Sequence, residues 1–166
     1  MTEPAPPSGS DLCLSCGLCC TGVLYLEVSA QEDEVTHMRG AGMEVRDDGE
    51  RLLLQLPCNH FRDGGCGIYA DRYTKCRSFR CALLKRVEAG EVEPAEANRI
   101  VEQAKASLEK LTAIDPQAKR ASYRVERRRA GAPAADAGPE ASRAWIEALA
   151  FDRFLDRFFR NKPMVS

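Results

Sequence analysis

Residues 13–20 read CLSCGLCC, which places four of the chain's eight cysteines in one short run. Cys13, Cys16 and Cys19 recur at every third position, and Cys20 follows directly. Two cysteines in a C-x-x-C turn can reach one metal ion together, and three at this interval match the run with which ferredoxins bind an iron–sulfur cluster. Neighbouring side chains diverge, so we expect Cys20 to serve a second site or to pack. The run therefore predicts a metal centre.

The other four cysteines are spread over a glycine-containing stretch that we predict to be loops and short turns. They are Cys58, Cys66, Cys76 and Cys81. Eight thiols make up two complete four-sulfur shells, and we predict that all eight are ligands of zinc or of an iron–sulfur cluster. The spacing leaves open whether each group of four holds its own metal or the two groups interleave. The three evenly spaced cysteines favour iron–sulfur slightly over zinc.

Composition limits the class of protein. The chain has 166 residues, a formal net charge of −1 and 44% hydrophobic residues, which is typical of a globular protein and not of a polycation that coats nucleic acid. No apolar run approaches the roughly 20 residues of a membrane span. The first ten residues lack a basic region followed by an apolar stretch, so we expect no secretory signal and a cytoplasmic chain. Thiols in that reducing compartment favour metal binding over disulfides.

Local patterns predict a small α+β fold in which a hairpin and short helices surround cysteine-bearing loops. Residues 1–11 are rich in proline and are expected to be a disordered tail. We predict a strand over 23–28, a helix from 30 to 40 capped by Ser29, a hairpin of 43–46 with 51–56, and helices over 82–89 and 94–114. Residues 12–115 would form the metal-binding domain.

The last third of the chain predicts a helical extension on a linker. Residues 116–141 are first basic and then rich in Ala, Gly and Pro, which predicts a solvated surface or linker; a nucleic-acid patch is the less favoured alternative for the basic part. Residues 142–162 have one apolar and one charged face, as in an amphipathic helix. We expect the apolar face to dock on the domain; the alternative is a contact with a protein partner or a second copy.

The cysteine pattern resembles the YkgJ-type cysteine-cluster family, a zinc- or iron-chelating domain with the motif CxxCxxCC. The resemblance spans about residues 12–85 and includes the segments Cys66-Gly67-Ile68-Tyr69-x2-Arg72 and Cys76-Arg77-x-Phe79-x-Cys81. One departure is Tyr73, where the family usually has proline. The resemblance implies chelation by these cysteines and no particular reaction.

The charge of the predicted metal centre indicates which residues would stabilise it. A metal held by four thiolates is negatively charged, so we predict that Arg72 and Arg77 lie next to the ligands and offset that charge. His60 is a lesser candidate ligand, and His37 is expected at the surface.

Three functions remain open. The first is a metal-binding module, in which the metal cross-links irregular loops. The second is a redox or catalytic iron–sulfur protein, and the third is an interaction module that uses the C-terminal helix. The sequence contains no nucleophile motif and no phosphate-binding loop, so it offers no candidate catalytic residue and leaves enzymatic activity open.

Overall fold

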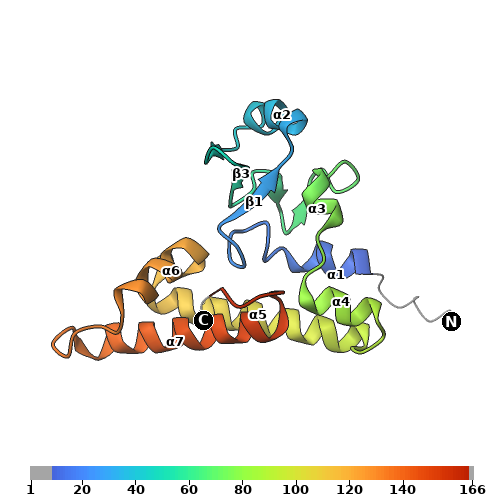
Figure 1. Ribbon diagram of the computed structural model, residues 1–166. Helices are drawn as coiled ribbons and strands as arrows, with labels where there is room; N and C mark the ends of the chain where they lie inside the picture. Colours follow the sequence, from blue (N-terminus) through green and yellow to red (C-terminus); the bar gives the residue numbers. More distant parts are fainter. Residues whose placement is uncertain (1–8, 165–166) are drawn as a thin grey trace.

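The computed structural model describes residues 9–164, which form a helical layer with a smaller β layer on top of it (Figure 1). Of the predicted tail, residues 1–8 lie outside this range, while residues 9–11 belong to the first helix. The helical layer contains α1 (Gly9–Cys16), α4 (Ala82–Glu88), α5 (Pro94–Ile114), η2 (Pro116–Lys119), α6 (Ala121–Ala130) and α7 (Gly138–Phe158). The β layer contains β1 (Glu27–Ala30), η1 (Glu32–Glu34), α2 (Val35–Gly40), β2 (Val45–Asp47), β3 (Leu52–Gln55), β4 (Phe61–Arg62), β5 (Gly65–Cys66) and α3 (Thr74–Ser78).

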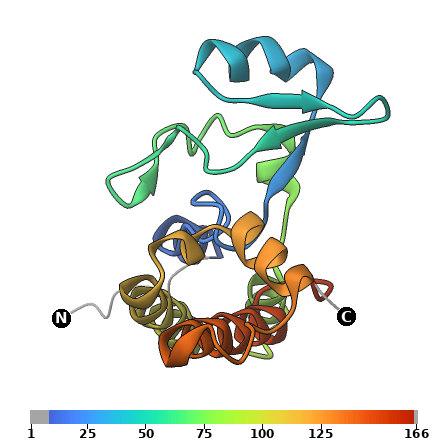
Figure 2. The ribbon, with the colours of Figure 1, turned by 90° about the vertical axis from the view of Figure 1, so that its left-hand side faces the viewer.

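The long helices α5 and α7 pack side by side and form the base of the molecule (Figure 2). The predicted helix over 94–114 is confirmed: Pro94 occupies the first turn, where its missing N–H costs nothing. Its apolar side is buried against α7, whose own buried residues include Phe151 and Leu155. The apolar face of the C-terminal helix therefore docks within the chain, as expected. No helix within residues 9–164 combines the length and apolar character needed to cross a membrane.

The prediction of a linker over 116–141 is wrong for its first half. Residues 116–130 form η2 and α6, and only the Ala/Gly/Pro-rich residues 131–137 connect α6 to α7 without a helix. The reason is that the basic segment is not uniformly solvated: Arg124 is 2% exposed and pairs with Asp152 of α7. The last helix also begins earlier than predicted, because Pro139 after Gly138 starts it.

The β layer is a three-stranded antiparallel sheet in the order β1-β3-β2. The predicted hairpin is confirmed, with Val45 opposite Leu54 and a turn at Gly49 that has positive φ. The predicted strand over 23–28 lies later, at Glu27–Ala30, because Ser29 pairs with Leu53 in the sheet and does not cap a helix. The helix expected from residue 30 is accordingly η1 followed by α2.

Two separate hydrophobic cores hold the layers. The helical core includes the buried Leu18, Val23 and Leu24 from the segment that follows α1. The β layer has a much smaller core, made of Val35, Met38, Met43, Val45, Leu54 and Tyr73. A core of this size gives little stability by itself, so the cysteine-bearing loops around it depend on further contacts.

Leu155 tests the helical core. It is fully buried between α7 and the rest of this core, so Leu155→Ala should lower the free energy of unfolding by about 2–5 kcal/mol. Ile146 on the same helix is 59% exposed, and Ile146→Ala should change it by less than about 0.5 kcal/mol. Urea unfolding followed by circular dichroism measures both; equal effects would contradict this packing.

Candidate metal centre

The N-terminal cysteines lie on α1 and on the turn that follows it. Cys13 and Cys16 are three residues apart in the helix and so share one face. Cys19 and Cys20 lie on the turn, which is closed by backbone bonds from Gly22 N–H to Cys19 O at 3.1 Å and from Leu24 N–H to Leu18 O at 3.0 Å. A rigid turn therefore presents two adjacent thiols that must diverge.

Gly17 ends α1 and allows the turn to meet the β layer. Its φ is +66°, a left-handed conformation that favours glycine. A Cβ at this position would lie 2.3 Å from Cζ of Phe61, so a larger residue would displace that ring. Phe61 lies in β4, between two of the later cysteines in the sequence. The Gly17–Phe61 contact thus brings the N-terminal run against the second cysteine segment.

The later cysteines come from four different local structures. Cys58 follows β3, and its N–H donates to Cys20 O at 2.7 Å. Cys66 lies in β5 opposite Phe61, and Cys76 lies in α3. Cys81 is the N-cap of α4, where its sulfur accepts a bond from Leu84 N–H at 3.3 Å. The backbone therefore brings Cys58 close to Cys20 and leaves Cys81 with the helices.

Packing divides five of the eight cysteines between the two cores. Cys16, Cys19 and Cys81 contact the helical core. Cys58 and Cys76 contact the β-layer core. This division does not follow the order of the cysteines in the sequence. Cys81 packs against the same core as Cys16 and Cys19, whereas Cys76, five residues earlier, packs against the other core.

The largest electrostatic interactions among the thiols follow the same division. Burial raises the pKa of Cys16 to about 12, and the thiols of Cys81 and Cys13 add to the rise. Burial likewise raises the pKa of Cys19 well above its ordinary value, with further contributions that are largest from Cys16 and Cys81 and smaller from Cys20 and Cys13. We call Cys13, Cys16, Cys19 and Cys81 the helix-side group.

The remaining four thiols act on one another. Burial raises the pKa of Cys20 to about 12, and the thiols next in effect are Cys58, Cys66 and Cys76, ahead of Cys13. Burial raises the pKa of Cys76 to about 11, again with contributions from Cys58 and Cys66. We call Cys20, Cys58, Cys66 and Cys76 the sheet-side group. Cys19 and Cys20, adjacent in sequence, thus belong to different groups.

The two groups are sets of neighbours and not closed coordination shells. All eight cysteines are free thiols. Among residues 9–164, no three His, Cys, Asp or Glu side chains are arranged as they would be around a metal ion. Four thiols near one another are nevertheless the donor set that zinc and iron–sulfur clusters take.

Of the two predicted supporting arginines, Arg72 lies beside the thiols. Its Nη1 is 3.9 Å from the sulfur of Cys13, and its positive charge lowers the pKa of Cys76, against the larger effect of burial. Its guanidinium stacks 3.7 Å from the centre of the Tyr69 ring and donates to Tyr69 O at 3.0 Å, which fixes its orientation. Arg72 thus interacts with one member of each group. Arg77 instead donates to Thr74 Oγ1 at 3.4 Å.

Tyr73 was not predicted as a site residue, although the departure from the family pattern marks it. It is 6% exposed, and its hydroxyl lies 3.0 Å from Nε2 of His60. Burial raises its pKa to about 12, and the thiols of Cys58 and Cys76 contribute. His60, the lesser candidate ligand, is thus a hydrogen-bond partner of Tyr73. His37 is exposed, as predicted, with its ring 5.9 Å from that of Tyr73.

Comparison with known families places the chain. It belongs to the CxxCxxCC family, whose model matches residues 12–115 and is described as a putative zinc- or iron-chelating domain. This confirms the family suggested by the cysteine motif. No curated protein and no solved structure matches the chain. Helix α6 and helix α7 lie beyond the matched residues.

The raised pKa values predict late ionisation of the thiols. In the reduced, metal-free chain, Cys16, Cys20 and Cys76 should ionise near pH 11–12, against an ordinary value of 9.0. The pKa values of these thiols are higher in the folded chain than in the unfolded chain. The buried neutral thiols therefore contribute fully to the free energy of unfolding below pH 9, and this contribution is lost as the pH rises through 11–12. Ultraviolet thiolate absorbance measures this, with the chain in guanidinium as control. Identical titration of native and denatured chains would contradict the burial of these thiols.

Proposed function

We propose that this chain binds zinc or iron–sulfur through two four-cysteine sites, one formed by the helix-side group and one by the sheet-side group. Membership of a zinc- or iron-chelating family supports metal binding in general. The observation that carries the finer proposal is that Cys19 packs with Cys81 against the helical core, whereas the carbonyl of the adjacent Cys20 accepts a hydrogen bond from Cys58 N–H of the β layer. Each group contains four sulfurs, which is the number that a zinc ion or a cluster requires.

Charge supports the same proposal. Metal ligands must be thiolates, so binding must displace the protons that burial holds on these thiols. Zinc with four thiolates carries a net charge of −2. Arg72, held by Tyr69 and close to Cys13, would offset part of that charge. Arg77 would contribute from α3 only at longer range.

The role that the structure supports best is a module in which bound metal cross-links the loops of the β layer. The β layer has a small core, and the sheet-side cysteines come from three of its segments and from the turn after α1. A bound metal would connect these segments covalently, so metal binding would contribute directly to folding. A reducing, cytoplasmic compartment would keep the thiols available, and the cytoplasmic location stays a prediction.

A redox function is the second candidate, and the interval of Cys13, Cys16 and Cys19 favours it. An iron–sulfur cluster would supply an electron acceptor; the protein would supply the thiols and the buried surroundings. The interaction function has less support, because α5 covers the apolar face of α7 and Ile146 is the large apolar residue of α7 that stays exposed.

Metal stoichiometry tests the two-site proposal. After anaerobic purification, the chain should carry two four-thiolate sites; Cys81→Ser should empty the helix-side site and Cys66→Ser the sheet-side site, each halving the metal content. Ser15→Ala, in the same N-terminal run, should change nothing. Elemental analysis measures the content, and visible absorbance bleached by dithionite distinguishes iron–sulfur from colourless zinc. Loss of all metal in both cysteine variants would contradict separate sites.

A further inference from the structure

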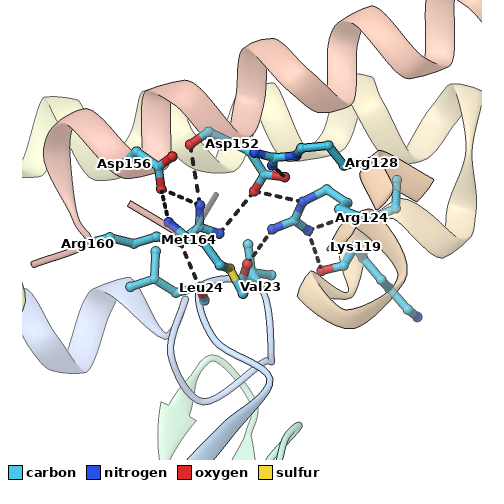
Figure 3. Close-up of polar contacts among 10 residues, drawn as sticks. Val23, Leu24, Lys119, Arg124, Arg128, Asp152, Asp156, Arg160 and Met164 are labelled. Carbon is cyan, nitrogen blue, oxygen red and sulfur yellow. Dashed lines mark hydrogen bonds and ion pairs between the residues drawn. The ribbon is translucent and has the colours of Figure 1, made fainter. Parts of the chain in front are cut away.

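The C-terminal helices hold the turn that carries Cys19. Three consecutive carbonyl groups after this turn accept hydrogen bonds from residues beyond the family-matched region. Gly22 O accepts from Ala121 N–H at 2.9 Å, Val23 O from Arg124 Nη2 at 2.5 Å, and Leu24 O from Arg160 Nε at 3.1 Å. Figure 3 shows both arginines reaching down from the helices to this segment. Each carbonyl is therefore held by a separate donor.

One carboxylate orients both arginines. Asp152 is 2% exposed, and its Oδ1 accepts from Arg124 Nε at 3.1 Å and from Arg160 Nη2 at 3.0 Å. Its Oδ2 accepts from Arg128, and Asp156 takes a further bond from Arg160 at 2.7 Å (Figure 3). A buried charge is costly unless it is paired and hydrogen-bonded. This network satisfies that condition, and three arginines against two aspartates leave one net positive charge.

The end of α7 also holds both neighbours of Cys81. Phe159 O accepts from Ala82 N–H at 2.9 Å, and Asn161 Nδ2 donates to Arg80 O at 2.9 Å. The segments that carry Cys19 and Cys81 are thus attached to the same helix end, although 61 residues separate them in the sequence. Cys20 differs, because its carbonyl is bonded by Cys58 of the sheet-side group.

The network lies close to the helix-side thiols. The pKa of Tyr25 depends on both the thiols and the network. Burial raises this pKa to about 12, Cys19 and Cys81 raise it further, and the positive charge of Arg160 lowers it. Tyr25 is therefore close enough to Cys19, Cys81 and Arg160 for all three to shift its pKa.

We propose that Arg124 and Arg160, oriented by Asp152, are positioning residues for the helix-side group. They fix the turn of Cys19 relative to Cys81 and so set how tightly that site holds its metal. This inference rests on the two-site function proposed above. It assigns a role to the C-terminal helices, which lie outside the family-matched residues. Because Cys20 is bonded from the β layer, the effect is confined to one of the two sites.

The test is Arg160→Lys, which keeps the positive charge but loses the forked bonds. It is made in Cys66→Ser, which retains the helix-side site, and in Cys81→Ser, which retains the sheet-side site. Transfer of bound zinc to an excess of a chromogenic chelator should become about tenfold faster in the first background, as when a supporting contact of a ligand is lost. It should not change in the second. Arg153→Lys, on the exposed side of α7, is the matched control and should change neither.

Each other outcome overturns the inference. Equal acceleration in both backgrounds would make the network a general stabiliser, and no acceleration would make it irrelevant to the site. If Arg160→Lys does not fold by circular dichroism, Arg124→Lys takes its place; if neither folds, the network is a folding element only. If the unsubstituted chain binds no zinc and no iron, the proposed function fails as well, which separates that failure from a failure of positioning alone.

Discussion

Adjacent side chains on a tight turn cannot reach the same point, and this constraint at Cys19 and Cys20 organises the molecule. The turn is closed by its own backbone bonds and begins at a glycine against the Phe61 ring. One thiol consequently faces the helical core, and the other faces the β layer. The remaining six cysteines divide according to the layer in which they lie, with Cys81 on the helical side because it caps α4.

The two layers differ in how much they depend on the thiols. The helical layer has an extensive apolar core and a paired network of buried charges around Asp152. Removing one partner of such a buried pair typically costs about 3–5 kcal/mol, so the network ties the C-terminal helices firmly to the turn. The β layer has a much smaller core and two small sheets of three and two strands. A metal would therefore matter more to the folding of the β layer than to that of the helices.

Local patterns predicted what local physics determines. The periodic apolar positions after Pro94 predicted α5, the Asp-Asp-Gly turn predicted the β2–β3 hairpin, and the cysteine motif predicted the family. The capping signal at Ser29 failed because pairing with Leu53 in the sheet outweighed it. The basic segment was mistaken for a linker because Asp152, the partner of Arg124, lies 28 residues further along the chain. The division of the cysteines was equally hidden, since it depends on which core each segment joins.

The division of the eight thiols between two sites can be measured by finding which thiols a bound metal protects together in one molecule. The metal-loaded chain is partly stripped with a chelator, its free thiols are alkylated, and molecules that carry four labels are isolated by intact mass and fragmented. These molecules should be labelled on either the helix-side or the sheet-side group, so that whenever Cys19 is labelled Cys20 is protected, and the reverse. Joint protection of Cys13, Cys16, Cys19 and Cys20 in one molecule, with the other four labelled, would contradict this division.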